Sequence, residues 1–390
     1  MTPTCITGTG IVSCFGVGTD VIASALSKSN PKDRLNEKRL SAFNLQDSEH
    51  YLVNEINRSG MGQGYAGEIQ LFIKVIKQAL EQANIKTPLT DCGLIIGTSG
   101  FMFAAESEFR LHERSGNETA DAGYDGLIIN PVVNYFGIGG PVFSVHTACA
   151  SSANAMILAH EMISRDEAKR VIVVGAEGLG AVALSGFQSL MLLDKKGCRP
   201  FDSDRSGLQI GEAYGAIILE AKNSNPENES KAFTILGGEN LCDTHHVTSA
   251  SPDGIMMQHV IDQALANAGL KPADINFIKA HGTGSPDNDT AEAAALNSVF
   301  GQSMPPITVL KRYFGHTLGA CGVVETIGLF ACLQAGFLPA TAGFKNSDPA
   351  LNLIPLTKPI QNMSGYFLSN YFGFGGNYAA LLMHYEPAIA

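Results

Sequence analysis

The sequence predicts an α/β protein in which helices cover a sheet, and three observations support this prediction. Short β-branched, apolar runs alternate along the 390 residues with alanine-rich stretches of helical length. One of these runs, Arg170–Gly175, is apolar enough to be a strand covered on both faces. Apolar residues make up 45% of the chain and charged residues only 16%, which favours a large core or a wide subunit interface.

The first half of the chain contains six elements of this kind. The apolar side chains of Gly67–Asn84 recur on one helical face, and the other runs are short and flanked by turn residues. We expect strands over Cys5–Ser13, Gly93–Gly97, Arg170–Gly175 and Gly215–Leu219, and helices over Gly67–Asn84 and Ser152–Ser164.

The polar stretch Asn223–Ser230 has the composition of a linker, and the same rhythm begins again after it. Residues 1–222 and 231–390 are therefore interpreted as two halves that arose by internal duplication. In the second half we expect strands over Ala232–Gly237, Ile275–Ala280, Ser364–Phe367 and Tyr378–His384, and helices over Gly254–Gly269, Ala291–Val299 and Gly322–Ala335.

Charge and segment composition argue against several classes of protein. The chain has 26 basic and 37 acidic residues, and its net charge of −11 disfavours broad nucleic-acid binding, which needs a dense basic surface. The first residues lack the features of a signal peptide, and the most apolar later stretch, Thr326–Ala340, is too short to span a membrane. We therefore expect a cytoplasmic protein without a membrane span.

The eight cysteines form no Cys-x-x-Cys pair and no cluster with histidine at zinc-ligand spacing. They are scattered through apolar segments, where a free cysteine behaves as a small apolar residue. We therefore expect no metal site and no disulfide framework, and the question is whether any one of these thiols is reactive.

The first unusual junction surrounds Cys149. A strand-like segment, Pro141–His146, leads into small residues and then into a predicted helix, so Cys149 falls at or just before the start of that helix. Unpaired N–H groups and the positive end of the helix dipole favour a thiolate there and lower its pKa. A buried structural cysteine in a tight turn would give the same pattern.

Two further junctions carry histidines. His281 ends a predicted strand and opens a Gly-Thr-Gly-Ser loop, a place where α/β proteins hold binding groups, although a strand-end core histidine would look alike. His316 lies in a glycine-bounded loop five residues after Lys311 and before an apolar helix. A later glycine-rich turn, 372–376, can aim a backbone N–H at a ligand, or can be an ordinary hairpin.

Together these segments resemble one family, the elongating β-ketoacyl-acyl carrier protein synthases, or type II ketosynthases, of the thiolase superfamily. VHTACASSAN (145–154), HGTGSPDND (281–289), KRYFGHTLGACG (311–322) and FGFGG (372–376) occur in the family's order, and Arg199–Glu220 resembles a further segment between the first two. The resemblance covers nearly the whole chain. It implies an α/β thiolase-like fold with five layers, α-β-α-β-α, and two pseudo-repeated halves.

The resemblance also implies roles for individual residues. Cys149 matches the nucleophile that accepts the acyl chain, His281 and His316 match the two active-site histidines, and Lys311 matches the lysine that orients them. Phe374 matches the gating phenylalanine, whose backbone N–H joins that of Cys149 in an oxyanion hole. The supporting residues implied are Thr283, Asp289, Glu292 and Glu325.

The activity implied is a decarboxylative Claisen condensation of malonyl-carrier protein with an acyl chain on Cys149, in a fatty acid, polyene or polyketide pathway. It needs no metal or redox cofactor, because the phosphopantetheine of acyl carrier protein delivers both groups. A histidine at 316 distinguishes the chain from the initiating ketosynthases, which have asparagine there. The alternative is a non-catalytic partner similar to a chain-length factor, although those partners lack the nucleophile.

The expected partners are an acyl carrier protein and a second subunit, either another copy or a homologous ketosynthase or chain-length factor. The segment 61–70 lacks the basic residues with which the family docks its carrier protein, and the segment after the glycine turn reads Gly376-Asn377-Tyr378 where the family has Gly-Thr-Asn. The remaining candidates for carrier docking are Lys195, Lys196, Arg199 and Arg205.

The acyl pocket is assigned by alignment with the same family. Gly100 and Phe101 follow the predicted strand Gly93–Gly97 and match the segment that lines the acyl channel opposite Phe374. Many relatives have a branched aliphatic residue where Gly100 stands, so we expect the channel to admit a long or rigid chain.

Overall fold

The computed structural model describes residues 2–27, 36–39, 50–62, 64–100, 124–222 and 233–387. The predicted linker Asn223–Ser230 and the predicted pocket residue Phe101 lie outside these ranges. Among the described residues, one eleven-stranded sheet runs through the molecule, and it divides into two parts that meet where β1 pairs with β9.

The amino-terminal part of the sheet has the strand order β1-β8-β7-β5-β6. β5 is parallel to β6 and β7, whereas β8 is antiparallel to β7 and β1. The bounds are β1 Thr4–Ser13, β5 Cys92–Gly97, β6 Val142–Val145, β7 Arg170–Glu177 and β8 Ala213–Ala221.

The carboxy-terminal part repeats this arrangement with the order β9-β15-β14-β10-β11. β10 is parallel to β11 and β14, and β15 is antiparallel to β14 and β9, so each strand has a counterpart of the same direction in the other half. The bounds are β9 Phe233–Cys242, β10 Ile275–Lys279, β11 Ile307–Thr308, β14 Gly365–Phe372 and β15 Asn377–Tyr385.

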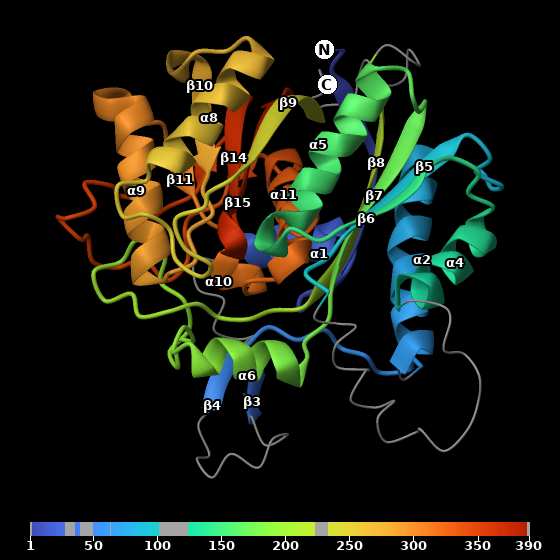
Figure 1. Cartoon of the computed structure of the whole chain (residues 1–390), viewed down its shortest axis with the longest axis horizontal. Helices are drawn as coiled ribbons and strands as arrows, with labels where there is room; N and C mark the ends of the chain where they lie inside the picture. Colours follow the sequence, from blue (N-terminus) through green and yellow to red (C-terminus); the bar gives the residue numbers. More distant parts are fainter. Residues whose placement is uncertain are drawn as a thin grey trace.

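The helices complete five layers (Figure 1). α2 and α4 cover the outer face of the first half-sheet, and α8 and α9 cover the outer face of the second. α5 and α11 lie between the two half-sheets. The bounds are α2 Gly64–Ala83, α4 Tyr124–Phe136, α5 Ser151–Ser164, α8 Ile255–Ala268, α9 Pro286–Phe300 and α11 Cys321–Gln334. The predicted five-layered, thiolase-like α/β fold is confirmed.

The two central helices explain why the chain carries so few charges. Residues Cys321–Leu333 of α11 are all buried, and α5 is buried over most of its length. A helix surrounded by protein has no polar face to present to water, so apolar and small residues occupy its whole circumference. Glu325 is the one acidic side chain in α11, and it lies in the active site described below.

Shorter elements surround the site, and the predicted elements are all present with shifted ends. The helix predicted over Ala291–Val299 begins five residues earlier, at Pro286, because Ser285 caps it by accepting a hydrogen bond from the backbone N–H of Asn288. The remaining bounds are β2 Gly16–Val17, α1 Thr19–Leu26, β3 Asn36–Arg39, β4 His50–Val53, α6 Ala181–Ser189, α10 Lys311–Phe314, β12 Phe337–Leu338 and β13 Ile360–Gln361. Within the described ranges no helix is long and apolar enough to cross a membrane.

Candidate active site

Cys149 lies in a single 3₁₀ turn, Ala148–Ala150, between β6 and α5. The preceding residue, Ala148, has a φ of +50°, a conformation that costs energy for any residue with a side chain and that recurs at functional sites. The turn packs tightly on β5: a Cβ on Gly97 would lie 2.3 Å from the Cα of Ser152. The sharp turn therefore needs small residues on both sides, which explains the Ala-Ser-rich sequence.

The glycine-rich turn after β14 meets this elbow. A Cβ on Gly373 would lie 2.9 Å from the backbone nitrogen of Cys149, and the backbone N–H of Phe374 donates a hydrogen bond to the Cys149 thiol. From the other side, the Cys321 thiol donates to the carbonyl oxygen of Cys149 at 3.0 Å. The side-chain amide of Asn377 donates to the carbonyl of Phe374 at 2.8 Å, so the unusual Asn377 helps to fix this turn.

The protonation state of Cys149 differs from the sequence expectation. Burial raises the pKa of the Cys149 thiol well above its ordinary value, and the charge of Lys311 and the N–H of Phe374 oppose this effect only in part. The position just before α5 was expected to lower this pKa. Only 6% of the cysteine is exposed, so the loss of hydration raises the pKa of the thiol more than the positive end of the helix dipole lowers it.

His281 and His316 face each other beside the sulfur. Their ring centroids are 5.4 Å apart at an interplanar angle of 82°, and both side chains are buried. Within the described part of the chain, neither ring nitrogen of His281 and not Nδ1 of His316 has a hydrogen-bond partner. Unpartnered buried polar atoms are costly, so their presence beside a pocket indicates groups kept for a ligand.

Both histidines are neutral at neutral pH. Burial, then the charge of Lys311, then His316 and Lys279 hold the pKa of His281 well below its ordinary value. Burial, Lys311 and Lys279 do the same for the pKa of His316. A neutral imidazole presents one N–H donor and one acceptor, so each ring can donate a hydrogen bond to a carbonyl oxygen.

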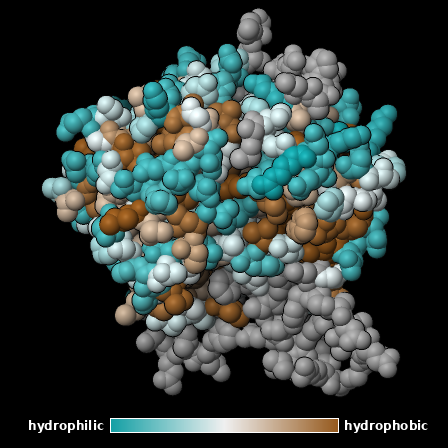
Figure 2. Space-filling model, turned by 45° about the horizontal axis from the view of Figure 1, so that its top comes forward, coloured by the Kyte–Doolittle hydropathy of each residue, from teal (hydrophilic) through white to brown (hydrophobic). Residues whose placement is uncertain are grey.

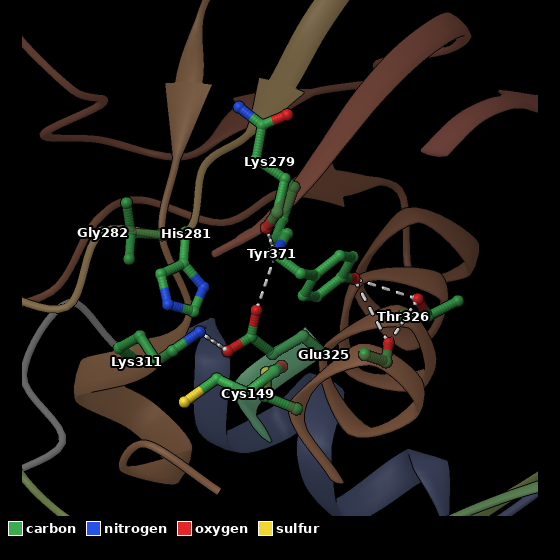
Figure 3. Close-up of polar contacts among 12 residues, drawn as sticks. Cys149, Lys279, His281, Gly282, Lys311, Glu325, Thr326 and Tyr371 are labelled. Carbon is green, nitrogen blue, oxygen red and sulfur yellow. Dashed lines mark hydrogen bonds and ion pairs between the residues drawn. The ribbon is translucent and has the colours of Figure 1, made fainter. Parts of the chain in front are cut away.

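A buried ion cluster lies behind the histidines (Figure 3). The carboxylate of Glu325 in α11 forms two ion pairs: Oε1 pairs with Lys311, and Oε2 pairs with Lys279 at 2.7 Å. All three side chains are buried. Burial favours a neutral carboxyl, but the two lysines outweigh it and hold the pKa of Glu325 below its ordinary value. Burial likewise opposes the charge of Lys311, but Glu325, Cys321 and Cys149 keep its pKa above the ordinary value.

Asp289, Glu292 and Thr283 shape the His281 loop and do not reach the sulfur. Glu292 accepts hydrogen bonds from the backbone N–H groups of His281 at 2.7 Å and Gly282 at 2.8 Å. Asp289 accepts from the N–H of Phe201 at 2.7 Å, and the Thr283 hydroxyl bonds that of Ser285 at 2.9 Å. Burial raises the pKa of Glu292 to about 7 and that of Asp289 to about 6.

A pocket opens beside these residues. It is lined by Cys149, both histidines, Thr283 and Phe374, and its mouth is formed by residues 246–250 and by Asp287 and Asn288. The ring of Phe374 packs on that of Phe187 from α6 at a centroid distance of 5.6 Å, and both rings line the same pocket as Cys149. Sequence reasoning did not predict that the segment 246–250, His-Val-Thr-Ser-Ala, lines the pocket.

The four basic residues predicted to dock the carrier protein differ in their surroundings. Arg199 pairs with Asp194 at 3.1 Å, and Arg205 pairs with Asp348 at 2.7 Å, so both guanidinium groups are held by acids of the chain itself. The part of these two arginines in carrier docking stays a prediction. Lys195 and Lys196 are exposed, as docking requires.

Gly100 does not line the pocket just described, so its place in an acyl channel stays a prediction. Its φ of +85° requires glycine on backbone grounds, whereas a Cβ there would have only His146 Nδ1 nearby, at 3.7 Å. A bulky residue at this position would strain the backbone as well as fill space. Its neighbour Phe101 lies outside the described residues.

Lys279 is the principal residue that sequence reasoning missed. It ends β10 two residues before His281, and its side chain is fully buried. A lysine at the end of a strand normally reaches solvent. The available signal was the position itself, next to a histidine at the carboxyl end of a buried strand.

The described residues contain no group of three or more His, Cys, Asp or Glu side chains placed to hold a metal ion.

Comparison with known proteins gives two matches to models of one family. The model described as the N-terminal domain of beta-ketoacyl synthase matches residues 66–225, and the model of the C-terminal domain matches residues 233–345. Together they cover most of the chain, and the gap between them falls at the predicted linker.

Curated relatives carry related descriptions. A mitochondrial 3-oxoacyl-[acyl-carrier-protein] synthase of Arabidopsis thaliana is 34% identical over 262 residues, which are 63% of this chain and 57% of that protein. The 3-oxoacyl-[acyl-carrier-protein] synthase 2 of Mycobacterium bovis is 33% identical over 60% of this chain and 59% of its own length. The matched region thus spans less than two thirds of these relatives. A chloroplastic synthase I of Arabidopsis thaliana is 29% identical over 95% of this chain and 84% of its own.

Solved structures share the fold over the whole chain. A beta-ketoacyl synthase of Burkholderia phymatum superposes with a TM-score of 0.83 at 25% identity, covering 99% of this chain and 100% of that one. A ketosynthase solved with its chain length factor, from Xenorhabdus doucetiae, gives 0.79 at 26% identity over 99% and 98%. A type II polyketide complex of ketosynthase and acyl-carrier protein gives 0.86 at 22% identity over 99% of both chains, which shows likeness of fold alone.

Proposed function

Because the chain belongs to the beta-ketoacyl synthase family, we propose that it condenses a malonyl thioester with an acyl chain held on Cys149, with loss of CO2. The observation that carries this proposal is the meeting of Cys149, His281 and His316 at one pocket, with the N–H of Phe374 on the sulfur. A nucleophile, two neutral donors and an oxyanion site are the parts that the reaction needs.

The first half-reaction loads the enzyme. The sulfur of Cys149 attacks the carbonyl carbon of an acyl thioester, a new S–C bond forms, and the bond to the carrier thiol breaks. The thiol proton leaves with the departing carrier thiol. The backbone N–H groups of Cys149 and Phe374 stabilise the oxyanion, which offsets the unfavourable ionisation of a buried sulfur.

The second half-reaction uses the histidines. His281 and His316 donate hydrogen bonds to the carbonyl oxygen of the malonyl thioester, so negative charge can collect there as CO2 departs. The resulting carbanion attacks the acyl carbon, the C–C bond forms, and the bond to the Cys149 sulfur breaks. Burial of both rings keeps water from protonating the carbanion before it reacts.

The proposal needs no metal or redox cofactor, since decarboxylation supplies the carbanion and the thiol carries the acyl group. Both acyl groups would arrive on the phosphopantetheine of an acyl carrier protein in the cytoplasm. Entry past residues 246–250, with Lys195 and Lys196 contacting the carrier, is supported by the position of the pocket mouth and by the exposure of both lysines.

A second subunit is part of the proposal. Among the described strands, β6 lies at one edge of the sheet, and Val142 and Phe143 on it are exposed, Phe143 by 45%. Apolar surface is gathered in patches on the face shown in Figure 2. Pairing of the β6 edge with another copy, or with a homologue such as the chain length factor of the Xenorhabdus complex, would cover Val142 and Phe143.

The second candidate function is a non-catalytic partner that sets chain length, favoured only by the likeness to a ketosynthase solved with its chain length factor. The purified chain should decarboxylate malonyl-carrier protein and become acylated by acyl-carrier proteins, as read by intact mass. A Cys149→Ala variant is the matched control for acylation. A wild-type chain that does neither would favour the partner function.

A further inference from the structure

Lys279 is a fully buried cation whose bonds all point away from the pocket. Its Nζ donates to Glu325 Oε2 at 2.7 Å and to the carbonyl oxygen of Asn370 at 2.9 Å, and it stands 3.5 Å from the centre of the Tyr371 ring. Figure 3 shows it on the far side of Glu325 from Lys311. It does not line the pocket and cannot touch a substrate there.

The charge balance of this cluster is unusual. Lys311 and Lys279 share the single carboxylate of Glu325, so with both lysines protonated the cluster carries a net charge of +1. Burial lowers the pKa of Lys279, and the charge of Glu325 opposes this effect. Without Lys279, the pair of Lys311 and Glu325 would be neutral. Charges act strongly over short distances in a buried site, so the excess is felt at the neighbouring thiol and imidazoles.

Among the described charged groups around the site, Glu177 opposes this excess at Cys149, with a smaller effect than that of Lys311. From β7, Glu177 accepts hydrogen bonds from the N–H groups of Ser99 at 2.8 Å and Gly319 at 3.1 Å, and its charge acts on Cys149 in the opposite direction to that of Lys311. From α9, the carboxyls of Glu292 and Asp289 bind backbone N–H groups, and burial favours their neutral forms. From α11, Cys321 is a buried thiol.

We propose that Lys279 is a positioning residue that occupies one oxygen of Glu325 and so leaves the charge of Lys311 only partly compensated beside the reacting sulfur. The excess charge stabilises an anionic sulfur at Cys149 and keeps His281 and His316 neutral, in the form that donates to a carbonyl oxygen. The consequence for the enolate rests on the proposed function. The consequence for the Cys149 thiol does not, because any thiolate beside this cluster is affected.

If Lys279 served only to hold the fold together, replacing it should lower the stability of the protein. The proposed electrostatic role predicts that stability is kept. Burying a cation removes it from water, and replacing a buried charged group by an apolar one of similar size is often neutral or stabilising when no charge is left unpaired. Lys279→Met leaves the balanced pair of Lys311 and Glu325. The variant should therefore keep its thermal stability while the reactivity of Cys149 falls, and that separation marks an electrostatic role.

The test measures alkylation of Cys149 by iodoacetamide against pH, with peptide mapping to identify the site. Cys242 is exposed, so all variants carry Cys242→Ser to remove a competing thiol. Alkylation follows the thiolate, so a rise of one unit in the midpoint slows the reaction about ten-fold below that midpoint. We expect about this slowing for Lys279→Met and near wild-type rates for Lys279→Arg, which keeps the charge.

Tyr371→Phe is the matched control, because it alters the same packing without changing charge. The Tyr371 hydroxyl bonds the Gly322 carbonyl at 3.2 Å, and its ring, which faces Lys279, is retained in the variant. A folded Lys279→Met variant with an unchanged midpoint would overturn the proposal. Equal shifts in Lys279→Met and Tyr371→Phe would also overturn it, because packing would then be the cause.

Two further measurements cover the case in which Lys279→Met does not fold. Lys279→Gln can still bond Glu325 and Asn370 and should give the same slowing. In the wild type, hydrogen–deuterium exchange at the histidine C2 position should show both imidazoles titrating below their ordinary range, and ordinary titration of either would overturn the proposal. Alkylation needs no acyl or malonyl substrate, so a chain that fails to condense but shows the predicted shifts separates the two proposals.

Discussion

The backbone of Gly373 lies directly against the backbone N–H of Cys149, and this contact joins the two halves of the fold at the reactive sulfur. A Cβ at position 373 would lie 2.9 Å from the Cys149 nitrogen and 3.1 Å from the Thr147 carbonyl oxygen. The φ of Gly373 is −111°, so backbone conformation does not require glycine there. Glycine is required because there is no space for a side chain between the two segments. One half of the fold supplies the nucleophile at this contact, and the other half supplies the N–H of Phe374.

Gly373→Ala should therefore separate the two N–H groups of the oxyanion site. We expect about a hundred-fold loss in the rate at which Cys149 is acylated, the usual cost of removing one oxyanion donor. Gly186→Ala in α6 is the control, because a Cβ there meets nothing within 4 Å. The measurement is the acylation rate by intact mass, with thermal unfolding to confirm the fold. If Gly373→Ala were acylated at the wild-type rate, the assignment of the Phe374 N–H to the oxyanion hole would be wrong.

Cys149 should be the only thiol acylated by acyl-carrier protein, because only it combines the elbow, the Phe374 N–H and the pocket. A small alkylating reagent is a weaker test of this assignment in the unmodified chain, since Cys242 is exposed and will react as well. Peptide mapping after brief incubation with acyl-carrier protein should place the acyl group on Cys149. Acylation first at Cys321 or Cys198 would contradict the assignment.

His281→Ala and His316→Ala should divide the reaction into its halves. Both rings face each other at the pocket and donate to the malonyl thioester in our mechanism, so either variant should lose condensation by at least about a hundred-fold. Transfer of an acyl group to Cys149 should continue at a measurable rate. Condensation at the wild-type rate in either variant would contradict the paired-donor mechanism.

The fold was largely predictable from the sequence because strand and helix signals come from local patterns. Arg170–Gly175 is apolar since both faces of β7 are covered, and α11 is apolar since it lies between two sheets. Cys149, His281, His316 and Lys311 were found from their positions at the ends of such elements, read with the family resemblance. These signals survive in a single sequence because the backbone at each junction needs particular small residues.

What remained hidden depends on long-range pairing. Nothing near Lys279 in the sequence shows that it meets Glu325, which is 46 residues away. Arg205 likewise meets Asp348, which is 143 residues away, only in the folded chain. The pKa of Cys149 was predicted in the wrong direction because burial, which depends on every surrounding element, outweighs the local helix end.

Glu292 gives a prediction about stability against pH. Burial raises its pKa from the ordinary 4.5 to about 7, so between these two values the folded chain binds a proton that the unfolded chain has lost. Its contribution to stability is therefore complete below pH 4.5 and is lost as pH rises through about 7. His281 and His316 act in the opposite sense, because their lowered pKa values make the unfolded chain the better proton acceptor in acid.

Glu292→Gln removes the titration, since glutamine stays neutral, although its single side-chain oxygen can accept from only one of the N–H groups of His281 and Gly282. The cost of the lost hydrogen bond is the same at every pH, so it does not alter the dependence on pH. Relative to wild type, the variant should therefore gain stability between pH 5 and pH 8, by up to about 3 kcal/mol if the whole shift is expressed. The free energy of unfolding in urea, measured for both proteins at both pH values, gives this difference, and Glu81→Gln on the exposed side of α2 should show none. A gap between wild type and Glu292→Gln that is the same at both pH values would mean that Glu292 is already ionised at pH 5 in the folded chain. In that case the backbone N–H groups of His281 and Gly282 would stabilise the carboxylate more than burial destabilises it, and the His281 loop would be anchored by a full negative charge.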